Sequence, residues 1–346
     1  MLLFKYLSPA GAAKVLEDSG AASLRFSLPK DFNDPYELFL QPSGPLSSEE
    51  HRAFYQFFLG DVVQAPALCF SRRPDSVTMW AHYASEGEGI ALAFDEDSLA
   101  EEFAVAYFAD VDYSDQPATV DVDLIERAFG TGKRRDGLNL LSAAHRAAFF
   151  RKRTEWGYER ERRLVVSNDA VSTTGELLTV ALAPRHMRYL ILGSRSNAEI
   201  RALCEARAGS YGLPLLEFRT GKRSVEPYFA RLVGTPLRWD GGEFQNYASA
   251  CRICGEPATT DSRGACSWCG IGDDARRVAA TRNMLAATLQ YGIDKGVPLE
   301  FEGLVAKGRL AEKHMAKMKQ RRDAPGLEDV ALQIKLFEAM KRAGHI

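Results

Sequence analysis

Four of the six cysteines lie close together in the last third of the chain, in two Cys-x-x-Cys pairs separated by eleven residues. They are Cys251, Cys254, Cys266 and Cys269. A Cys-x-x-Cys turn brings two thiolates to one side of a tight loop, and two such turns supply the four soft ligands of a structural zinc site. Glycines follow both pairs, at Gly255 and Gly270, where the backbone of such a loop often needs a positive φ. The spacing therefore predicts a zinc ribbon.

The four-thiolate pattern also indicates what the metal would do. Four protein ligands leave no open coordination position, so Zn2+ is expected to be structural rather than catalytic. Because so small a loop buries little apolar surface, metal binding is expected to supply its folding free energy. A redox pair is the weaker interpretation, since it usually occurs singly and opens a helix. The remaining cysteines, Cys69 and Cys204, lie in apolar segments and are interpreted as core thiols.

A second pattern that could do chemistry is the run of alternating charges that begins at Glu159. Glu159 and Glu161 are two residues apart at the expected start of a strand, so their side chains share a face. Arg163 shares that face and can orient or neutralise the two carboxylates. From the residue types alone, a solvated ladder of alternating charges is the favoured interpretation, because exposed ion pairs are common.

Short apolar runs and helical segments must position these residues. Strands are expected at 2–7, 24–28, 65–71, 89–95, 103–114, 162–168, 176–182, 188–194 and 213–219. Helices are expected after Ser8-Pro9, which suits a helix start, and at 47–60, 76–84, 138–153 and 196–209. The strands at 162–168 and 176–182 are expected to pair. Because strands and helices do not alternate regularly, the sequence predicts an α+β fold with a mixed sheet of short strands.

The composition changes near residue 235, which divides the chain into three expected parts. Residues 1–235 form the α+β domain, 236–274 a linker and the zinc ribbon, and 275–346 a helical C-terminal region. The stretch 307–322 holds seven basic residues and one acidic residue. It is interpreted either as a solvated helix face or, with the ribbon, as a contact to phosphates; the absence of interleaved aromatic residues slightly favours the first.

Charge and hydropathy limit the classes of protein to consider. The 346 residues hold 44 basic and 46 acidic side chains, a formal charge of −2, so no bulk positive field exists to hold nucleic acid. No run approaches the ~18 uncharged apolar residues of a membrane span. The start, MLLFKYLSPAG, lacks the pattern of a secretory signal, so a cytoplasmic location is expected. The motifs GxGxxG, GxxxxGK[ST], HExxH and GxSxG are absent.

Five phrases in the first two thirds resemble a bacterial family known as domain of unknown function 2971. They are LLFKYLS, LRFSLPKDFNDPYE, LCFSRRPDSVTMWAHYASEGEGIALAFD, KRTEWGYERERRL and YLILGS, and together they span residues 1 to about 220. The zinc ribbon and the helical tail lie outside this resemblance. The family is in turn distantly similar to the ADP-ribosyltransferase superfamily in the order of its strands. Where such transferases usually offer a histidine or arginine on the first strand, this chain has Lys5 or Tyr6.

The resemblance implies NAD as a possible substrate and a carboxylate that stabilises positive charge on its ribose. It assigns that role to Glu161 in preference to Glu159, with Arg163 as the orienting residue. Flat walls for nicotinamide or adenine are expected from Trp80, Tyr83, Trp156 and Tyr6, although buried aromatic residues usually belong to the core. His82 is left open between a base or phosphate donor and a structural residue.

A polar loop and one lysine complete the expected site. Asn33, Asp34 and Glu37 could line a ribose or acceptor pocket, or Asn-Asp-Pro could simply close a turn. Lys5 could snorkel outward, await an anion or pair with Glu161 or Glu37.

Two kinds of function follow from these expectations. The first is an ADP-ribosyltransferase-like enzyme that modifies a protein or nucleic-acid acceptor, targeted through 251–322, in a setting of phage defence or as a toxin. The alternative is a non-catalytic ligand sensor or a nucleic-acid-binding protein that uses the ribbon and the basic helix.

Overall fold

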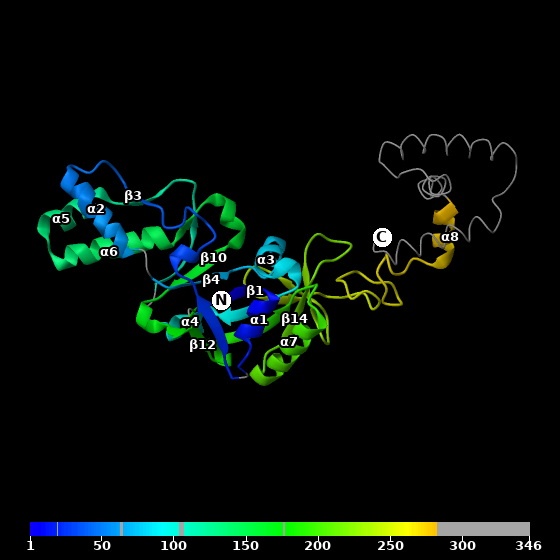
Figure 1. The fold of residues 1–346 in the computed structure, drawn as a ribbon. Coiled ribbons are helices and arrows are strands. Elements are labelled where there is room, and N and C mark those ends of the chain that lie inside the picture. Colours follow the sequence, from blue (N-terminus) through cyan, green and yellow to red (C-terminus); the bar gives the residue numbers. More distant parts are fainter. Residues whose placement is uncertain (19, 63–64, 104–106, 176, 282–346) are drawn as a thin grey trace, which may run out of the picture. The chain divides into compact units, whose positions relative to one another are not determined.

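Ten strands pair into one sheet in the computed structural model of the chain (Figure 1). The structure describes residues 1–18, 20–62, 65–103, 107–175 and 177–281. The sheet runs in the order β17 (Phe244–Asn246), β16 (Leu237–Trp239), β15 (Tyr228–Arg231), β14 (Leu215–Arg219), β13 (Met187–Leu192), β5 (Ile90–Asp95), β1 (Leu2–Leu7), β4 (Ala67–Ser71), β10 (Glu161–Val165) and β6 (Tyr107–Asp110). The fold is therefore mixed α+β, as the sequence predicts.

Smaller sheets flank the large one. They are β11 (Ser172–Thr174), β12 (Leu177–Leu182) and β2 (Ala22–Phe26); β3 (Leu40–Pro42) with β8 (Ala118–Val120); and β7 (Asp112–Tyr113) with β9 (Arg151–Lys152). The expected pairing of 162–168 with 176–182 is wrong, because β10 pairs with β4 and β6 whereas β12 pairs with β2 and β11.

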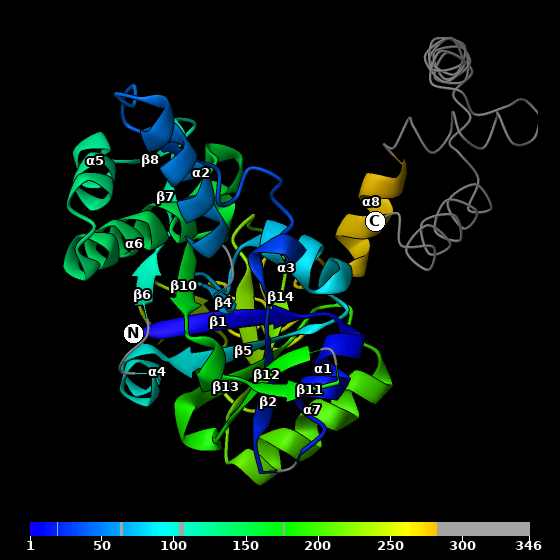
Figure 2. The same cartoon turned by 60° about the vertical axis from the view of Figure 1, so that its left-hand side comes forward.

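Two groups of helices cover the sheet. The helix α7 (Ala198–Tyr211) lies against β13 and β14 and contacts α1 (Pro9–Val15), whereas α2 (Glu49–Val62), α5 (Val122–Thr131) and α6 (Arg134–Phe149) contact one another, with α6 beside β3 and β8 (Figure 2). The start of α1 follows the expectation, since the Ser8 hydroxyl accepts a hydrogen bond from the Gly11 amide at 3.1 Å. The remaining helices are α3 (Val77–Tyr83), α4 (Glu96–Glu102) and α8 (Asp273–Thr281), with the 3-10 turns η1 (Pro29–Asp31), η2 (Ser85–Gly87), η3 (Thr154–Glu159), η4 (Asn168–Ala170) and η5 (Pro184–His186).

The core has three parts, divided by the large sheet and by the α2–α5–α6 group. The part around Phe4 extends the first domain beyond its expected end at residue 235. The Phe4 ring contacts Trp239 and Phe244, with ring centroids 5.1 Å and 6.2 Å apart. These contacts hold β16 and β17 as strands of the large sheet. The expectation of a linker after residue 236 is therefore wrong for this segment, because its glycines and proline form the turns of a hairpin-like edge.

The chain divides into two compact units, each described separately. The first comprises Met1–Ala250 with Gly255–Ala258, and the second holds Cys251–Cys254 and the residues from Thr259 onward. The expected helix after 275 begins as α8, whereas its continuation past 281 and the basic run 307–322 lie outside the described residues. Within the part of the chain that the structure describes, no helix has both the length and the apolar character needed to cross a bilayer.

Candidate functional site

Six charged side chains from distant parts of the chain meet around the strands β1 and β10 of the large sheet. This buried charge cluster consists of Lys5, Glu37, Lys152, Glu159, Glu161 and Arg163. They come from β1, the loop after η1, β9, the end of η3 and β10. With three carboxylates and three cationic groups, the cluster is formally neutral, which is what burial of so many charges requires.

Arg163 and Glu161 form the most buried pair of the cluster. The guanidinium binds both carboxylate oxygens of Glu161, with Nε to Oε1 at 2.7 Å and Nη2 to Oε2 at 3.0 Å. It also donates to Glu37 and to the Phe149 carbonyl. Although burial raises the pKa of Glu161, Arg163 and Lys152 outweigh it and hold that pKa well below its ordinary value. Glu161 is therefore a permanently charged carboxylate.

Lys152 is the point on which the three carboxylates converge. Its Nζ lies 2.7 Å from Glu159, 2.7 Å from Glu161 and 3.5 Å from Glu37. Burial alone would lower the pKa of Lys152, but the three neighbouring carboxylates raise it well above its ordinary value. Burial raises the pKa of Glu37 despite Arg163 and Lys152. The lysine thus holds the acidic groups together as a fixed positive charge.

Glu159 is the carboxylate that connects the cluster to the outer polar residues. One oxygen accepts from Lys152 and the other from the Tyr83 hydroxyl, to which the exposed Asn33 side chain also hydrogen-bonds. Burial and the Glu159 charge raise the pKa of Tyr83, so its hydroxyl stays protonated and remains a donor.

A sharp turn directs both glutamates to the same place. Glu159 ends η3, Arg160 has a left-handed backbone with φ of 44°, and Glu161 begins β10. The Ser71 hydroxyl donates to the Glu159 carbonyl at 2.6 Å, and the Arg72 amide donates to the Arg160 carbonyl at 2.9 Å. The expected grouping of the two glutamates with Arg163 is seen in their side-chain contacts, because Lys152 binds both glutamates and Arg163 binds Glu161; a turn at Arg160 rather than a continuous strand brings Glu159 there.

Lys5 reaches the cluster from β1 but forms a different contact from those expected. Its Nζ donates to the Cys69 carbonyl at 3.0 Å, where β1 and β4 pair at the single position Phe4 with Ser71. Burial lowers the pKa of Lys5, while the nearby Glu161 opposes that shift. Burial also raises the pKa of the Cys69 thiol to about 12, which fits the expected inert thiol.

The other expected site residues divide into core and surface. Tyr6 and Trp80 are buried against each other, and their polar atoms donate to the carbonyls of Arg73 and Pro74 at 2.7 Å each. Neither offers a free wall to a ligand, which is the usual position of aromatic residues in a core. His82 lies exposed on α3, with its Nδ1 3.0 Å from the Tyr158 hydroxyl.

Trp156 and Asp34 lie beside the cluster. Lys152 Nζ stands 5.6 Å from the centroid of the half-buried Trp156 ring. Asp34 is buried; its Oδ1 accepts from the Tyr36 amide at 2.9 Å, the turn that the Asn-Asp-Pro sequence favours, and its Oδ2 has no hydrogen-bond partner.

Two members of this region were missed from sequence. Lys152 begins the segment KRTEWGYERERRL and Tyr113 lies within the expected strand 103–114, and neither pattern marks the residue as part of a site. The Tyr113 hydroxyl accepts from the Glu161 amide at 2.8 Å. Lys152 stands between Arg151 and Arg153, and nothing in this local sequence distinguishes it as the buried member of the basic run.

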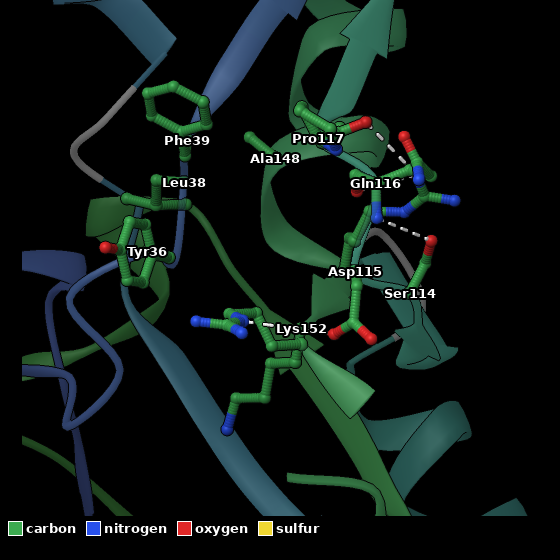
Figure 3. A pocket seen from close by; sticks show the side chains of 12 residues that line it. Tyr36, Leu38, Phe39, Ser114, Asp115, Gln116, Pro117, Ala148 and Lys152 are labelled. Carbon is green, nitrogen blue, oxygen red and sulfur yellow. Dashed lines mark hydrogen bonds and ion pairs between the residues drawn. The ribbon is translucent and has the colours of Figure 1, made fainter. Parts of the chain in front are cut away.

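A cavity of about 300 Å³ opens beside the cluster (Figure 3). Tyr36, Leu38 and Phe39 stand on one side, and Ser114, Asp115, Gln116 and Pro117 on the other. Lys152 lines its end, with its amino group directed away from Phe39 and Pro117 (Figure 3). The cluster and the cavity therefore share one residue.

The four cysteines lie as the spacing predicts. Their sulfur atoms all lie within 4.8 Å of one another, with Cys254 Sγ and Cys266 Sγ 4.0 Å apart, close to the about 3.8 Å expected of tetrahedral thiolates around zinc. Amides donate to the sulfurs, and those of Cys254 and Cys266 lower the pKa of Cys251 to about 6. Gly255 has a positive φ as expected, whereas the second such glycine is Gly264 rather than Gly270. These four residues are placed to hold a metal ion.

Comparison with known proteins identifies one family. The model described as "Protein of unknown function (DUF2971)" matches residues 79–164, about a quarter of the chain. The matched segment includes Tyr83, Lys152, Glu159, Glu161 and Arg163, and it supports the assignment of this region to that family. No curated protein and no solved structure matches the chain.

Proposed function

We propose that the chain is an enzyme that cleaves the nicotinamide–ribose bond of NAD and transfers ADP-ribose to an acceptor. The observation that carries this proposal is the convergence of Glu37, Glu159 and Glu161 on Lys152 beside a cavity. Breaking that bond develops positive charge on the ribose, and a fixed carboxylate in a water-poor site stabilises it. The resemblance rests on the order of strands along the sequence, and three of those strands, β1, β4 and β10, are neighbours in the sheet, which is a second support.

Glu159 is the better candidate for the carboxylate that faces substrate. Both oxygens of Glu161 are already held by Arg163, and Lys152 adds a third contact, so Glu161 acts as a positioning residue. Glu159 instead binds Tyr83 and Lys152, and Tyr83 leads outward to the exposed Asn33. Substrate that displaces the Tyr83 hydroxyl would meet the Glu159 carboxylate, with Lys152 orienting it.

The test is the release of nicotinamide from NAD by the purified chain, with water as the acceptor. We expect Glu159→Gln to lower the rate at least about 100-fold, since it removes the charge that the transition state requires. Glu155→Gln is the matched control, because Glu155 is an exposed residue of the same turn η3. Chromatography quantifies nicotinamide, and thermal melting confirms that both variants fold. No release above the protein-free blank, or equal rates in the two variants, would falsify the proposal.

We also propose that the metal of the four-cysteine cluster is zinc with a structural role. The donor set is four thiolates without an open position. Elemental analysis of the full chain is expected to find one zinc per molecule, and Cys254→Ser is expected to lose most of it. Cys204→Ala is the control, because Cys204 is buried in α7 apart from the cluster. Full zinc content in Cys254→Ser would contradict the assignment.

A further inference from the structure

The tips of the two cysteine loops present exposed apolar side chains at equivalent positions. Ile253 is the third residue of the first Cys-x-x-Cys turn and is 68% exposed; Trp268 is the third residue of the second turn and is 64% exposed. The sulfur atoms of the four cysteines that flank these two residues lie within 4.8 Å of one another, so the same cluster fixes the backbone of both tips. Because the cysteines at both ends of each turn anchor its backbone, the exposed Trp268 indole has little freedom to lose beyond its own side-chain rotations when it stacks on a flat ligand.

Arginine side chains accompany these tips within the same unit. Arg252, also exposed, lies between Cys251 and Ile253, and its stem lies across Gly264, where an added Cβ would come within 2.6 Å of Arg252 Cδ. Gly264 has φ of +77°, so the glycine permits both the turn and this close approach. Arg263 donates to Asp261 and to the Gly270 carbonyl, which fixes its guanidinium near the second turn.

The distribution of charge along the chain favours an anionic partner. Residues 251–346 carry 16 basic and 12 acidic side chains, a net +4, whereas residues 1–250 carry 28 and 34, a net −6. The overall charge of −2 hides this asymmetry. The excess of basic residues lies in 282–346, outside the described residues, because 251–281 carry four basic and four acidic side chains; the attraction for a polyanion therefore belongs to the C-terminal sequence as a whole.

We infer that the two cysteine loops, residues 251–270, bind single-stranded nucleic acid, with one base stacked on Trp268 and phosphates contacted by arginines such as Arg252. Single strands fit because their bases are free to stack, and each base offers a flat face. Ile253 offers an apolar surface to a neighbouring base or sugar. This inference is independent of NAD cleavage, since it uses none of the residues of the buried charge cluster.

The test uses the full, zinc-loaded chain and fluorescence anisotropy of labelled 12-nucleotide DNA and RNA oligomers of mixed sequence. We expect binding that weakens as salt rises, and a loss of about 5- to 100-fold in affinity for Trp268→Ala. Trp268→Phe is expected to retain much of the affinity, because stacking needs a flat ring. The control is Phe57→Ala, which removes an aromatic side chain that is 82% exposed on α2.

Four results bear on the inference and its alternatives. Equal zinc content in Trp268→Ala and the unaltered chain shows that the variant keeps its metal and that any lost affinity belongs to the ring. Failure of the unaltered chain to bind either oligomer at low salt overturns the inference and favours a protein as the partner of the exposed loop tips. Equal affinity of Trp268→Ala and the unaltered chain overturns it as well. Preference for DNA or RNA identifies which single strand is the ligand.

Discussion

Replacing Arg163 with methionine is expected to destabilise the first unit by about 3–5 kcal/mol. Arg163 is fully buried and binds Glu161 through two nitrogens, Glu37 through one of these and the Phe149 carbonyl through the third. Methionine fills much of the volume but leaves both carboxylates without that counter-charge. An uncompensated buried charge costs far more than the pair itself contributes, which is why the expected effect is large. Chemical denaturation monitored by circular dichroism measures the loss.

The matched control is Arg188→Met, which removes an arginine from strand β13 of the same sheet. Arg188 is half-exposed and lies 3.1 Å from Asp95, so its loss is expected to cost about 1 kcal/mol or less. If Arg163→Met does not fold, Arg163→Lys keeps the charge while it loses the two-nitrogen contact, and is expected to fall between the two. Equal losses for Arg163→Met and Arg188→Met would show that the buried charge cluster is not a coupled network.

A double substitution shows whether the cost comes from stranded charge. Adding Glu161→Gln to Arg163→Met removes one of the two carboxylates that have lost their contact with Arg163, so the double variant is expected to be more stable than Arg163→Met alone. The difference from additivity measures the coupling of the pair. Additive losses would place the cost of Arg163→Met in packing rather than in charge.

The members of this cluster differ in how far sequence could predict them. Glu161 and Arg163 are two residues apart, so strand periodicity alone places them on one side. Glu37 joins them from 126 residues away, and nothing in its local sequence distinguishes a buried ligand of arginine from a loop carboxylate. Lys152 belongs to a two-residue strand that pairs with β7, an element too short for any periodicity to show. Only tertiary pairing brings these side chains together.

The aromatic residues show the opposite limitation. The sequence pattern of Trp80 and Tyr6 fits both a ligand wall and a core, and the position of the facing element decides between them. Trp80 on α3 stacks on Phe218 of β14 with ring centroids 4.7 Å apart. The two residues are far apart in the sequence, so no local pattern predicts this contact. By contrast, the cysteine spacing needs no tertiary information, because the four ligands lie within nineteen residues.

Gly89→Ala and Gly193→Ala are each expected to lower the free energy of unfolding by about 3 kcal/mol or more. Gly89 precedes β5 and Gly193 follows β13, and the Gly193 amide donates to the Gly89 carbonyl at 2.9 Å. A Cβ on Gly89 would overlap the Leu7 carbonyl group at the end of β1. A Cβ on Gly193 would lie 2.7 Å from the Gly87 carbonyl carbon and 2.8 Å from the Gly89 oxygen.

Both clashes are with backbone atoms, and this decides the size of the expected effect: Leu7 ends β1, whereas Gly87 ends η2 and Gly89 directly precedes β5. A flexible side chain can rotate away from an added methyl group, whereas a carbonyl in a hydrogen-bonded sheet moves only with its strand. The strand affected by Gly89→Ala is β1, which carries Lys5 to the buried charge cluster. Gly89→Ala is therefore expected to disturb the candidate site as well as the stability of the fold.

Gly137→Ala is the matched control, because it makes the same chemical change where there is space. Gly137 lies within α6, and no atom outside its own helix lies within 4 Å of the added Cβ. Alanine favours helix, so this variant is expected to gain about 0.5–1 kcal/mol. Thermal and urea unfolding of the three variants side by side measure the contrast. Three variants of equal stability would mean that the ends of β1 and β13 do not pack as closely as their carbonyl positions require.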